Sequence, residues 1–158
     1  MEIYQVSYQS PIGMMLIGAT NEGIHRVNFI DDAISETQEG NHPHLVECIK
    51  QLDEYFNANR RSFSLALNPQ GTPFQQKVWR ALLKIPFGEI RTYGQIAAAI
   101  GNIKAARAVG MANNKNKIGI IIPCHRVIGA NGQLTGYGGG LWRKEWLLKH
   151  EQESVDLA

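Results

Sequence analysis

Cysteine is scarce in this chain of 158 residues, and the two that occur, Cys48 and Cys124, lie far apart in unlike contexts. Two such residues cannot form a framework of several disulfide bonds, and they lack the CxxC spacing of a zinc cluster. Both thiols are therefore expected to be reduced. We predict no metal and no cofactor.

Long hydrophobic runs are also missing. No segment approaches the roughly 18 consecutive apolar residues that a membrane-spanning helix requires. The first residues, Met1 to Tyr4, do not combine a basic region with an apolar stretch, as a secretory signal would. These absences predict a cytoplasmic protein that has no membrane partner. An apolar content of 44% is typical of a globular chain, and the length fits one or two small domains.

Net charge is small, at +2, but it is unevenly distributed. Residues 1–68 contain 4 basic and 9 acidic side chains, whereas residues 69–158 contain 12 basic and 5 acidic ones. A basic second half favours a polyanionic partner such as a nucleic acid. The alternative is an ordinary solvated surface, which charge alone does not exclude.

The first half of the chain predicts a small α/β domain. Short apolar or alternating runs are separated by turn residues, which is typical of an antiparallel sheet. A helix is expected to begin near Pro43 and to bury Cys48 as a small packed residue. The expected strands are 3–8, 14–19 and 24–30, with a loop at 31–40 and one further short strand at 63–67.

The second half predicts mostly helices. Thr72 and Thr92 each begin a capping box, the first helix is expected to continue to Pro86, and Gly101 is a natural cap for the second. With a third helix soon after Gly101, the tight turn is typical of a helix-turn-helix. The predicted fold is α+β. An N-terminal α/β domain, with an antiparallel sheet and a helix, spans 1–70, and a mostly helical C-terminal domain spans 71–158.

The outer face of the third helix combines cations with very small residues. Lys104, Arg107 and Met111 share one side of this helix, and Ala106 and Gly110 lie beside them. Small residues allow a helix backbone to approach a groove closely, and a long cation there can reach deeper than the helix. The alternative is a basic face that only contacts solvent.

A thiol lies directly beside an imidazole in the run from Pro123 to Val127. The preceding residues 118–122 are apolar and mostly β-branched, so they predict a buried strand that places Cys124 at its end. A thiol becomes a nucleophile when a base such as His125 takes its proton, and a carboxylate usually orients that base. The alternative is an inert buried cysteine beside a structural histidine. The residues leave the carboxylate open among Glu89, Glu145, Glu151, Glu153 and Asp156.

Glycine-rich turns follow the nucleophile. Gly129 to Gly132 predict a hairpin between 127–128 and 133–135. The segment 136–140, four glycines and Tyr137, predicts a loop that could close over a flat ligand. A last helix is expected over 141–151.

The second half resembles the O6-alkylguanine-DNA alkyltransferases, also called methylated-DNA–protein-cysteine methyltransferases. The resemblance covers 73–151 with every motif in order, whereas the first half matches only in its α/β character and length. The quoted motifs are Pro86-Phe-Gly-Glu89 with Thr92-Tyr93, Lys104-Ala-Ala-Arg-Ala-Val-Gly110, Ile122-Pro-Cys-His-Arg-Val127, Gly139-Gly-Leu141 and Lys144-Glu-Trp-Leu-Leu-Lys-His-Glu151.

The resemblance implies one irreversible transfer per molecule. Cys124 would take the alkyl group of O6-alkylguanine, His125 would act as base through a water, and Glu151 would orient His125. Arg107 would fill the gap left by the extruded base, and Tyr93 would protonate the leaving guanine. The implied DNA- and substrate-binding residues are Tyr93, Lys104, Ala105, Ala106, Arg107, Gly110, Asn116, Tyr137 and Gly138.

The implied partner is double-stranded DNA, bound through its minor groove by a protein that is a monomer off DNA. Gly138 departs from the small hydroxyl or methyl residue of many members, which would weaken contact with the guanine O6. Two other functions remain open, a non-catalytic module that binds alkylated DNA and a Cys-His-Glu acyl hydrolase. Activity on O4-alkylthymine and the preferred alkyl size are also open.

Overall fold

The computed structural model describes residues 2–31 and 41–157, which fall into two compact units, Met1–Gln70 and Gly71–Ala158. Of the loop predicted at 31–40, all but Asp31 lies outside the described residues. The α+β fold class predicted from the sequence is confirmed.

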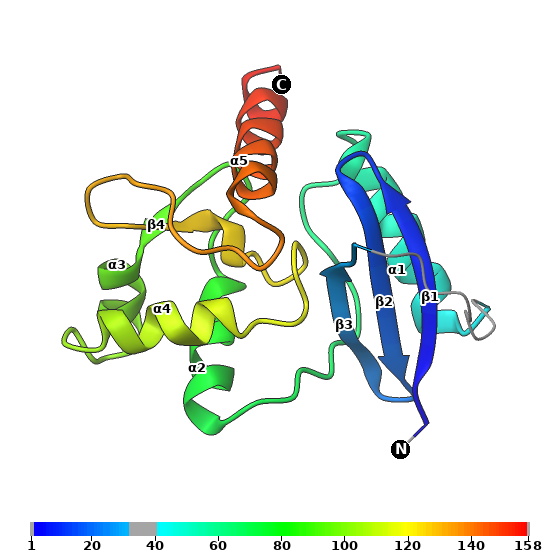
Figure 1. Ribbon diagram of the computed structural model, residues 1–158, viewed down its shortest axis with the longest axis horizontal. Coiled ribbons are helices and arrows are strands. Elements are labelled where there is room, and N and C mark those ends of the chain that lie inside the picture. Colours follow the sequence, from blue (N-terminus) through cyan, green and yellow to red (C-terminus); the bar gives the residue numbers. More distant parts are fainter. Residues whose placement is uncertain (1, 32–40, 158) are drawn as a thin grey trace. The chain divides into compact units, whose positions relative to one another are not determined.

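The first unit is a three-stranded antiparallel sheet with one helix against it (Figure 1). Strands β1 (Tyr4–Ser10), β2 (Gly13–Thr20) and β3 (Gly23–Phe29) follow one another in sheet order, as their turn residues predict. Helix α1 (Pro43–Phe56) buries Cys48 completely, and burial raises the pKa of this thiol to about 12. This cysteine is therefore a packing residue, as the sequence predicts.

The short strand predicted at 63–67 is wrong. The segment forms a single parallel bridge, between Leu67 and Ile24. Two backbone hydrogen bonds hold it, from Ile24 N to Ala66 O (2.8 Å) and from Asn68 N to Ile24 O (2.7 Å). The segment therefore touches the edge of the sheet without extending along it.

Four helices form most of the second unit: α2 (Pro73–Leu82), α3 (Tyr93–Ala99), α4 (Ala106–Asn114) and α5 (Leu141–Asp156). The capping boxes at Thr72 and Thr92 are both present and begin α2 and α3. Helix α2 ends at Leu82, before the predicted stop at Pro86. After Leu82 the backbone forms 3-10-type hydrogen bonds, in which the amides of Lys84 and Ile85 each donate to the carbonyl three residues earlier. The residue before a proline also disfavours the helical conformation, so the helix does not continue to Pro86.

Helices α3 and α4 pack against each other and are joined by a short turn, in the arrangement predicted as a helix-turn-helix (Figure 1). Gly101 adopts φ +82° in that turn, a conformation that favours glycine. The indole of Trp79 in α2 donates to the carbonyl of Ala112 in α4 (2.9 Å), which fixes α4 to the helix behind it. One face of α4 is thereby held and the other is exposed.

The buried strand predicted at 118–122 is wrong. The segment is apolar and buried, but its backbone makes local turns, with hydrogen bonds from Ile121 N to Gly119 O and from Ile122 N to Ile118 O. Ile120 adopts φ +69°, which is costly for a β-branched residue and incompatible with a strand.

The hairpin predicted around Gly129 to Gly132 is also wrong. The turn exists, closed by a hydrogen bond from Gly129 N to Gln133 O (2.9 Å), but 133–135 is not a strand. Strand β5 (Val127–Ile128) instead pairs in parallel with β4 (Arg91–Thr92), which directly precedes α3. The pairing joins the segment after Cys124 to the start of the helix-turn-helix.

Helix α5 runs five residues beyond the predicted end at Glu151. Its buried side chains are Lys144, Leu147 and Glu151, spaced three and four residues apart on one face. Two of these three side chains are charged, so this face of α5 provides buried polar contacts as well as apolar packing. Within 2–31 and 41–157, no helix has the length and apolar character needed to cross a membrane.

Candidate active site

Cys124 is the first residue of a 3-10 turn, Cys124–Arg126, that follows Pro123 and leads into β5. The prediction that Cys124 lies at the end of a strand is therefore wrong. The side chain of Cys124 is 6% exposed, and Asn113 in α4 donates to its carbonyl oxygen (3.3 Å). The thiol is thus held in a rigid, nearly buried turn.

The side chain of Asn116 organises the turns before the thiol. Its amide nitrogen donates to the carbonyls of Ile118 (3.3 Å) and Ile122 (2.9 Å), and its oxygen accepts from Ile118 N (3.0 Å). It also lowers the pKa of Cys124 by hydrogen bonding. Asn116 therefore shapes the turns that lead to Cys124.

His125 and Glu151 form a buried hydrogen-bonded pair. His125 Nε2 lies 2.7 Å from Glu151 Oε2, and the two side chains are 0% and 1% exposed. Because a carboxylate accepts, Nε2 carries the proton and Nδ1 keeps its lone pair. Nδ1 is buried and has no hydrogen-bond partner in the structure. This is the nitrogen that could take a proton through a bridging water.

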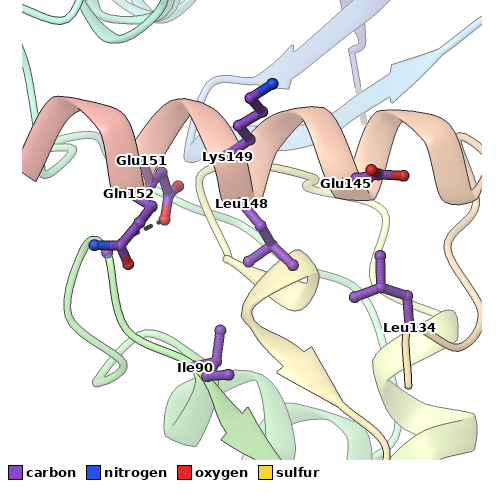
Figure 2. Close-up of a pocket in the computed structure, with 8 residues that line it drawn as sticks. Ile90, Leu134, Glu145, Leu148, Lys149, Glu151 and Gln152 are labelled. Carbon is purple, nitrogen blue, oxygen red and sulfur yellow. Dashed lines mark hydrogen bonds between the residues drawn. The ribbon is translucent and has the colours of Figure 1, made fainter. Parts of the chain in front are cut away.

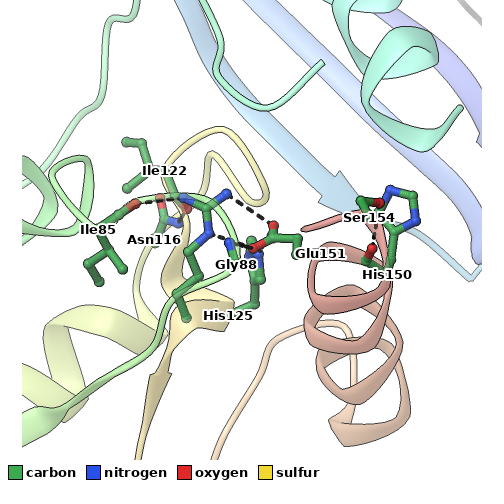
Figure 3. Close-up of polar contacts among 9 residues, drawn as sticks. Ile85, Gly88, Asn116, Ile122, His125, His150, Glu151 and Ser154 are labelled. Atoms are coloured by element: carbon green, nitrogen blue, oxygen red, sulfur yellow. Dashed lines mark hydrogen bonds and ion pairs between the residues drawn. The ribbon is translucent and has the colours of Figure 1, made fainter. Parts of the chain in front are cut away.

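Arg126 binds the same carboxylate with two hydrogen bonds. Figure 3 shows this carboxylate, on Glu151, beside His125. Arg126 Nε lies 2.8 Å from Oε1 of Glu151 and its Nη2 3.0 Å from Oε2, while Nη1 donates to Ile85 O (2.7 Å). Gly88 N makes a longer contact with Oε1, at 3.4 Å. Planar two-point pairing of this kind fixes both orientation and charge. Glu151 is therefore held where it must be to orient His125.

Burial and charge together set the ionisation of this cluster. Burial would raise the pKa of Glu151, but His125 and Arg126 lower it far below its usual value. Burial lowers the pKa of His125, and Glu151 offsets part of that effect. Burial raises the pKa of Cys124, opposed by Asn116, by the charge of Lys144 and by nearby backbone amides. The resting site is thus a neutral imidazole and a protonated thiol beside a carboxylate.

An open pocket of about 500 Å³ lies over α3, α4 and the loop after β5. Tyr93 projects into it, with its hydroxyl 2.8 Å from Thr135 Oγ1. The residues that line it are Tyr93, Gly94, Ala106, Arg107, Gly110, Met111, Asn114, Ala130, Thr135 and Gly136. Four predicted DNA-binding residues are therefore brought together here.

The remaining predicted binding residues lie elsewhere. Lys104 is exposed and outside this pocket, and it lies in the turn before α4, so its predicted place on the third helix is wrong. Ala105 is buried as the N-cap residue that precedes α4. Tyr137 is partly exposed, and its pKa is raised by desolvation and further by the charge of Cys124. Gly138 is exposed, and an added Cβ would meet no atom within 4 Å. The structure gives Ala105 a packing position.

Two functional candidates, Arg126 and Lys144, were missed by the sequence analysis. Lys144 is 0% exposed, with Nζ 2.6 Å from Val127 O and 2.7 Å from Thr135 O. A signal for it existed, because Lys144 and Glu151 are seven residues apart, on the same face as Leu147. Charged residues on an otherwise apolar helix face indicate a buried polar cluster.

A second pocket, of about 340 Å³, lies along α5 (Figure 2). Ile90, Leu134 and Leu148 form its apolar part, with Glu145 and Lys149 beside them. Glu151 also lines this pocket, whereas Cys124 and His125 do not. Across 2–31 and 41–157, no group of three or more His, Cys, Asp or Glu side chains is arranged to hold a metal ion.

The pKa shifts predict how the stability of the second unit depends on pH. The pKa of His125 and that of Glu151 are both lowered by folding, so the unfolded chain takes up protons first as pH falls. The stability that these two groups contribute should therefore be full above about pH 6.5, fall as His125 protonates in the unfolded chain, and fall again below about pH 4.3 through Glu151.

Urea unfolding followed by tryptophan fluorescence tests this expectation, because the three tryptophans, Trp79, Trp142 and Trp146, all lie in the second unit. A His125→Asn variant should lose the part of the pH dependence that begins near pH 6.5. If the urea midpoint of unfolding of the unmodified protein stays constant from pH 7 to pH 5, the lowered pKa assigned to His125 is contradicted.

Comparison with known proteins relates this site to a family. The model of the 6-O-methylguanine DNA methyltransferase DNA-binding domain matches residues 73–153, and that of the ribonuclease-like domain of the same family matches 3–69. The methylated-DNA–protein-cysteine methyltransferase of Methanosarcina acetivorans is 50% identical, over 94% of this chain and 98% of the relative. The constitutive enzyme of Bacillus subtilis is 45% identical, over 96% of each chain.

Solved structures agree. The crystal structure of Mycobacterium tuberculosis OGT in complex with DNA superposes with a TM-score of 0.87 at 42% identity, covering 96% of this chain and 94% of that one. The second unit thus combines a helix-turn-helix with a buried cysteine, histidine and glutamate. The chain belongs to the 6-O-methylguanine DNA methyltransferase family.

Proposed function

We propose that Cys124 accepts the alkyl group from O6-alkylguanine in duplex DNA and keeps it as a thioether. The family supplies the activity: the chain is a methylated-DNA–protein-cysteine methyltransferase, which repairs DNA by alkyl transfer to a cysteine. The observation that carries the choice of Cys124 is its position beside the His125–Glu151 pair. The other cysteine, Cys48, is packed in the first unit with a pKa of about 12.

The thiol must lose its proton before it can attack. His125 Nδ1 is the buried acceptor without a partner, so a bridging water would carry the proton from Cys124 to it. Glu151 then stabilises the imidazolium through Nε2. The sulfur forms a bond to the alkyl carbon, the bond from that carbon to O6 breaks, and the guanine leaves with the electron pair. Since the thioether does not hydrolyse, each molecule acts once.

The leaving guanine needs a proton, and Tyr93 is its proposed source. Its hydroxyl lines the open pocket and already holds a hydrogen bond with Thr135 Oγ1. Tyr137, whose pKa the charge of Cys124 raises, lies in the loop that would cover the base. Gly138 in the same loop has no side chain to offer the guanine O6.

DNA is the partner of this family's solved complex, and we place the interface on the exposed face of α4. Ala106 and Gly110 on that face have little or no side chain, so the helix backbone can approach a minor groove closely. Arg107 projects from it and would occupy the space of the extruded nucleotide. Lys104 and the other cations of the basic second half would contact phosphates without sequence preference.

The whole activity is proposed for residues 71–158, acting as a monomer off DNA. Cys124, His125, Glu151 and α4 all belong to this unit. A nucleophilic thiol must remain reduced, which supports a cytoplasmic location.

Mass spectrometry after incubation with duplex DNA containing O6-methylguanine tests the proposal. We expect a stable gain of one methyl group on Cys124, and none for a Cys124→Ala variant that still binds DNA. Binding without any gain would support a non-catalytic module, and a released product with unchanged protein would support a hydrolase. Methyl transfer that persists in Cys124→Ala would contradict the role of Cys124. Cys48→Ala serves as the matched control and should still be methylated.

A further inference from the structure

Lys144 is the one lysine among the described residues that is completely buried. Lysine is almost never fully buried unless it is paired. The partners of its Nζ are two uncharged oxygens, Val127 O at 2.6 Å and Thr135 O at 2.7 Å. These two bonds use two of its three donors and leave its charge uncompensated.

No carboxylate neutralises Lys144 in the part of the chain that the structure describes. Glu151 is the buried carboxylate of this unit, and its two oxygens are taken by Arg126 and His125. The charges of Arg126 and Glu151 therefore balance each other. One positive charge, on Lys144, remains inside the site, and such a charge is costly until an anion forms beside it.

Val127, whose carbonyl accepts from Lys144, ends the 3-10 turn that begins at Cys124, and Val127 N donates to the carbonyl oxygen of Cys124. The thiol of Cys124, which can become an anion, therefore belongs to the turn that Lys144 contacts. The charge of Lys144 lowers the pKa of the thiol, and the thiol in turn raises the pKa of Lys144, which burial brings down to about 8. The other charged or titratable groups around the pair are His125 and Arg126 in the same turn as Cys124, Tyr137 in the following loop, and Arg143 and Glu151 in α5.

We propose that Lys144 is the counter-ion of the Cys124 thiolate, held in place by the carbonyls of Val127 and Thr135. The proposal rests on the role given above to Cys124. The proton still passes to His125, and Lys144 keeps its own protons throughout. Its charge makes the thiolate–imidazolium state more favourable than the His125–Glu151 pair alone would. Lys144 is thus a positioning residue that acts through the sulfur.

A purely structural role is the competing explanation, because Lys144 also ties β5 to the loop at Thr135. Two variants separate charge from hydrogen bonding. Lys144→Gln removes the charge and retains an N–H donor, and Lys144→Met removes both. Lys149→Gln is the matched control, since Lys149 lies in the same helix with its side chain 74% exposed.

The thiolate of Cys124 is titrated by its ultraviolet absorbance against a Cys124→Ala blank, and by its rate of alkylation with iodoacetamide. We expect the midpoint to rise by about one pH unit in both Lys144 variants, which is a tenfold loss of thiolate at neutral pH. Lys149→Gln should match the unmodified protein. An unchanged midpoint in Lys144→Gln, with a shift in Lys144→Met alone, would overturn the proposal in favour of the structural tie.

A reciprocal measurement needs no substitution at Lys144. Nuclear magnetic resonance titration of its ammonium group should give a lower pKa in Cys124→Ala than in the unmodified protein, because no thiol can then ionise beside it. Equal values would overturn the proposal even if the Lys144 variants fail to fold. Both titrations are made without DNA, so they test the Lys144–Cys124 pairing independently of methyl transfer. Failure of methyl transfer in the mass-spectrometric test would count against the proposed function alone.

Discussion

Replacement of Glu151 by glutamine is expected to lower the free energy of unfolding of the second unit by about 3–5 kcal/mol, the usual cost of breaking a buried ion pair from one side. Glutamine has nearly the same shape, so packing is conserved and the loss comes from charge. Arg126 would remain buried, 6% exposed, without the carboxylate that both its Nε and Nη2 now contact.

The measurement is urea unfolding followed by tryptophan fluorescence, at neutral pH where the carboxylate is fully ionised. Glu153→Gln is the matched control, because Glu153 lies two residues further along α5 with its side chain 63% exposed. Its contact with Lys149 at 4.0 Å is a surface pair, so the control should change stability by less than about 1 kcal/mol. Similar losses in the two variants would show that the buried network does not depend on Glu151.

The same substitution should slow methyl transfer by about 10²-fold, the lower end of what general base catalysis contributes. His125 Nε2 would face an amide that can donate as well as accept, so the ring would lose the partner that fixes its tautomer. Single-turnover rates on duplex DNA, measured in conditions where the variant is folded, test this. A rate equal to that of the unmodified protein would remove Glu151 from the mechanism.

Local signals predicted much of the fold. Capping boxes at Thr72 and Thr92 begin α2 and α3, and the turn residues of the first half separate β1, β2 and β3 as expected. In each case the determining interactions lie within a few residues of each other. Such interactions are readable in sequence because they do not depend on tertiary packing.

The prediction of a buried strand at 118–122 was wrong for a physical reason. The isoleucines of this segment favour extended structure, yet the side chain of Asn116 bonds the backbone of both Ile118 and Ile122 and curls the segment. Residues with high β-propensity can be held in turns when side-chain bonds and burial outweigh that preference. The positive φ of Ile120 is part of that arrangement, and no pattern of hydrophobic residues encodes it.

The candidate site was predictable only in part. The adjacency of Cys124 and His125 was visible, whereas the choice of Glu151 came from resemblance, because 26 residues separate it from His125. Arg126 and Lys144 were missed because basic side chains are expected at the surface. Their burial depends on α5 packing against the turn that carries Cys124, which is a tertiary contact.

Arg107→Ala is expected to slow repair of O6-methylguanine in duplex DNA by about 10–100-fold and to leave reaction with the free alkylated base unchanged. Extrusion of a nucleotide costs a few kcal/mol, part of which Arg107 would offset by filling the gap in the duplex. Each 1.4 kcal/mol of this stabilisation that is lost slows the reaction about tenfold. Arg107 is exposed on α4 and lines the open pocket, whereas Cys124 and its hydrogen-bonded neighbours are buried. The substitution therefore acts on the DNA and leaves the thiol intact.

Two control variants separate insertion from charge. Arg80→Ala removes one exposed cation from α2 outside the pocket, so it should change the duplex rate little. Arg107→Lys keeps the charge in place but replaces the planar guanidinium, so it should restore binding at low salt more than it restores the rate. If Arg107→Ala slows the free base as much as the duplex, Arg107 acts on the thiol chemistry, and the proposed insertion into DNA is wrong.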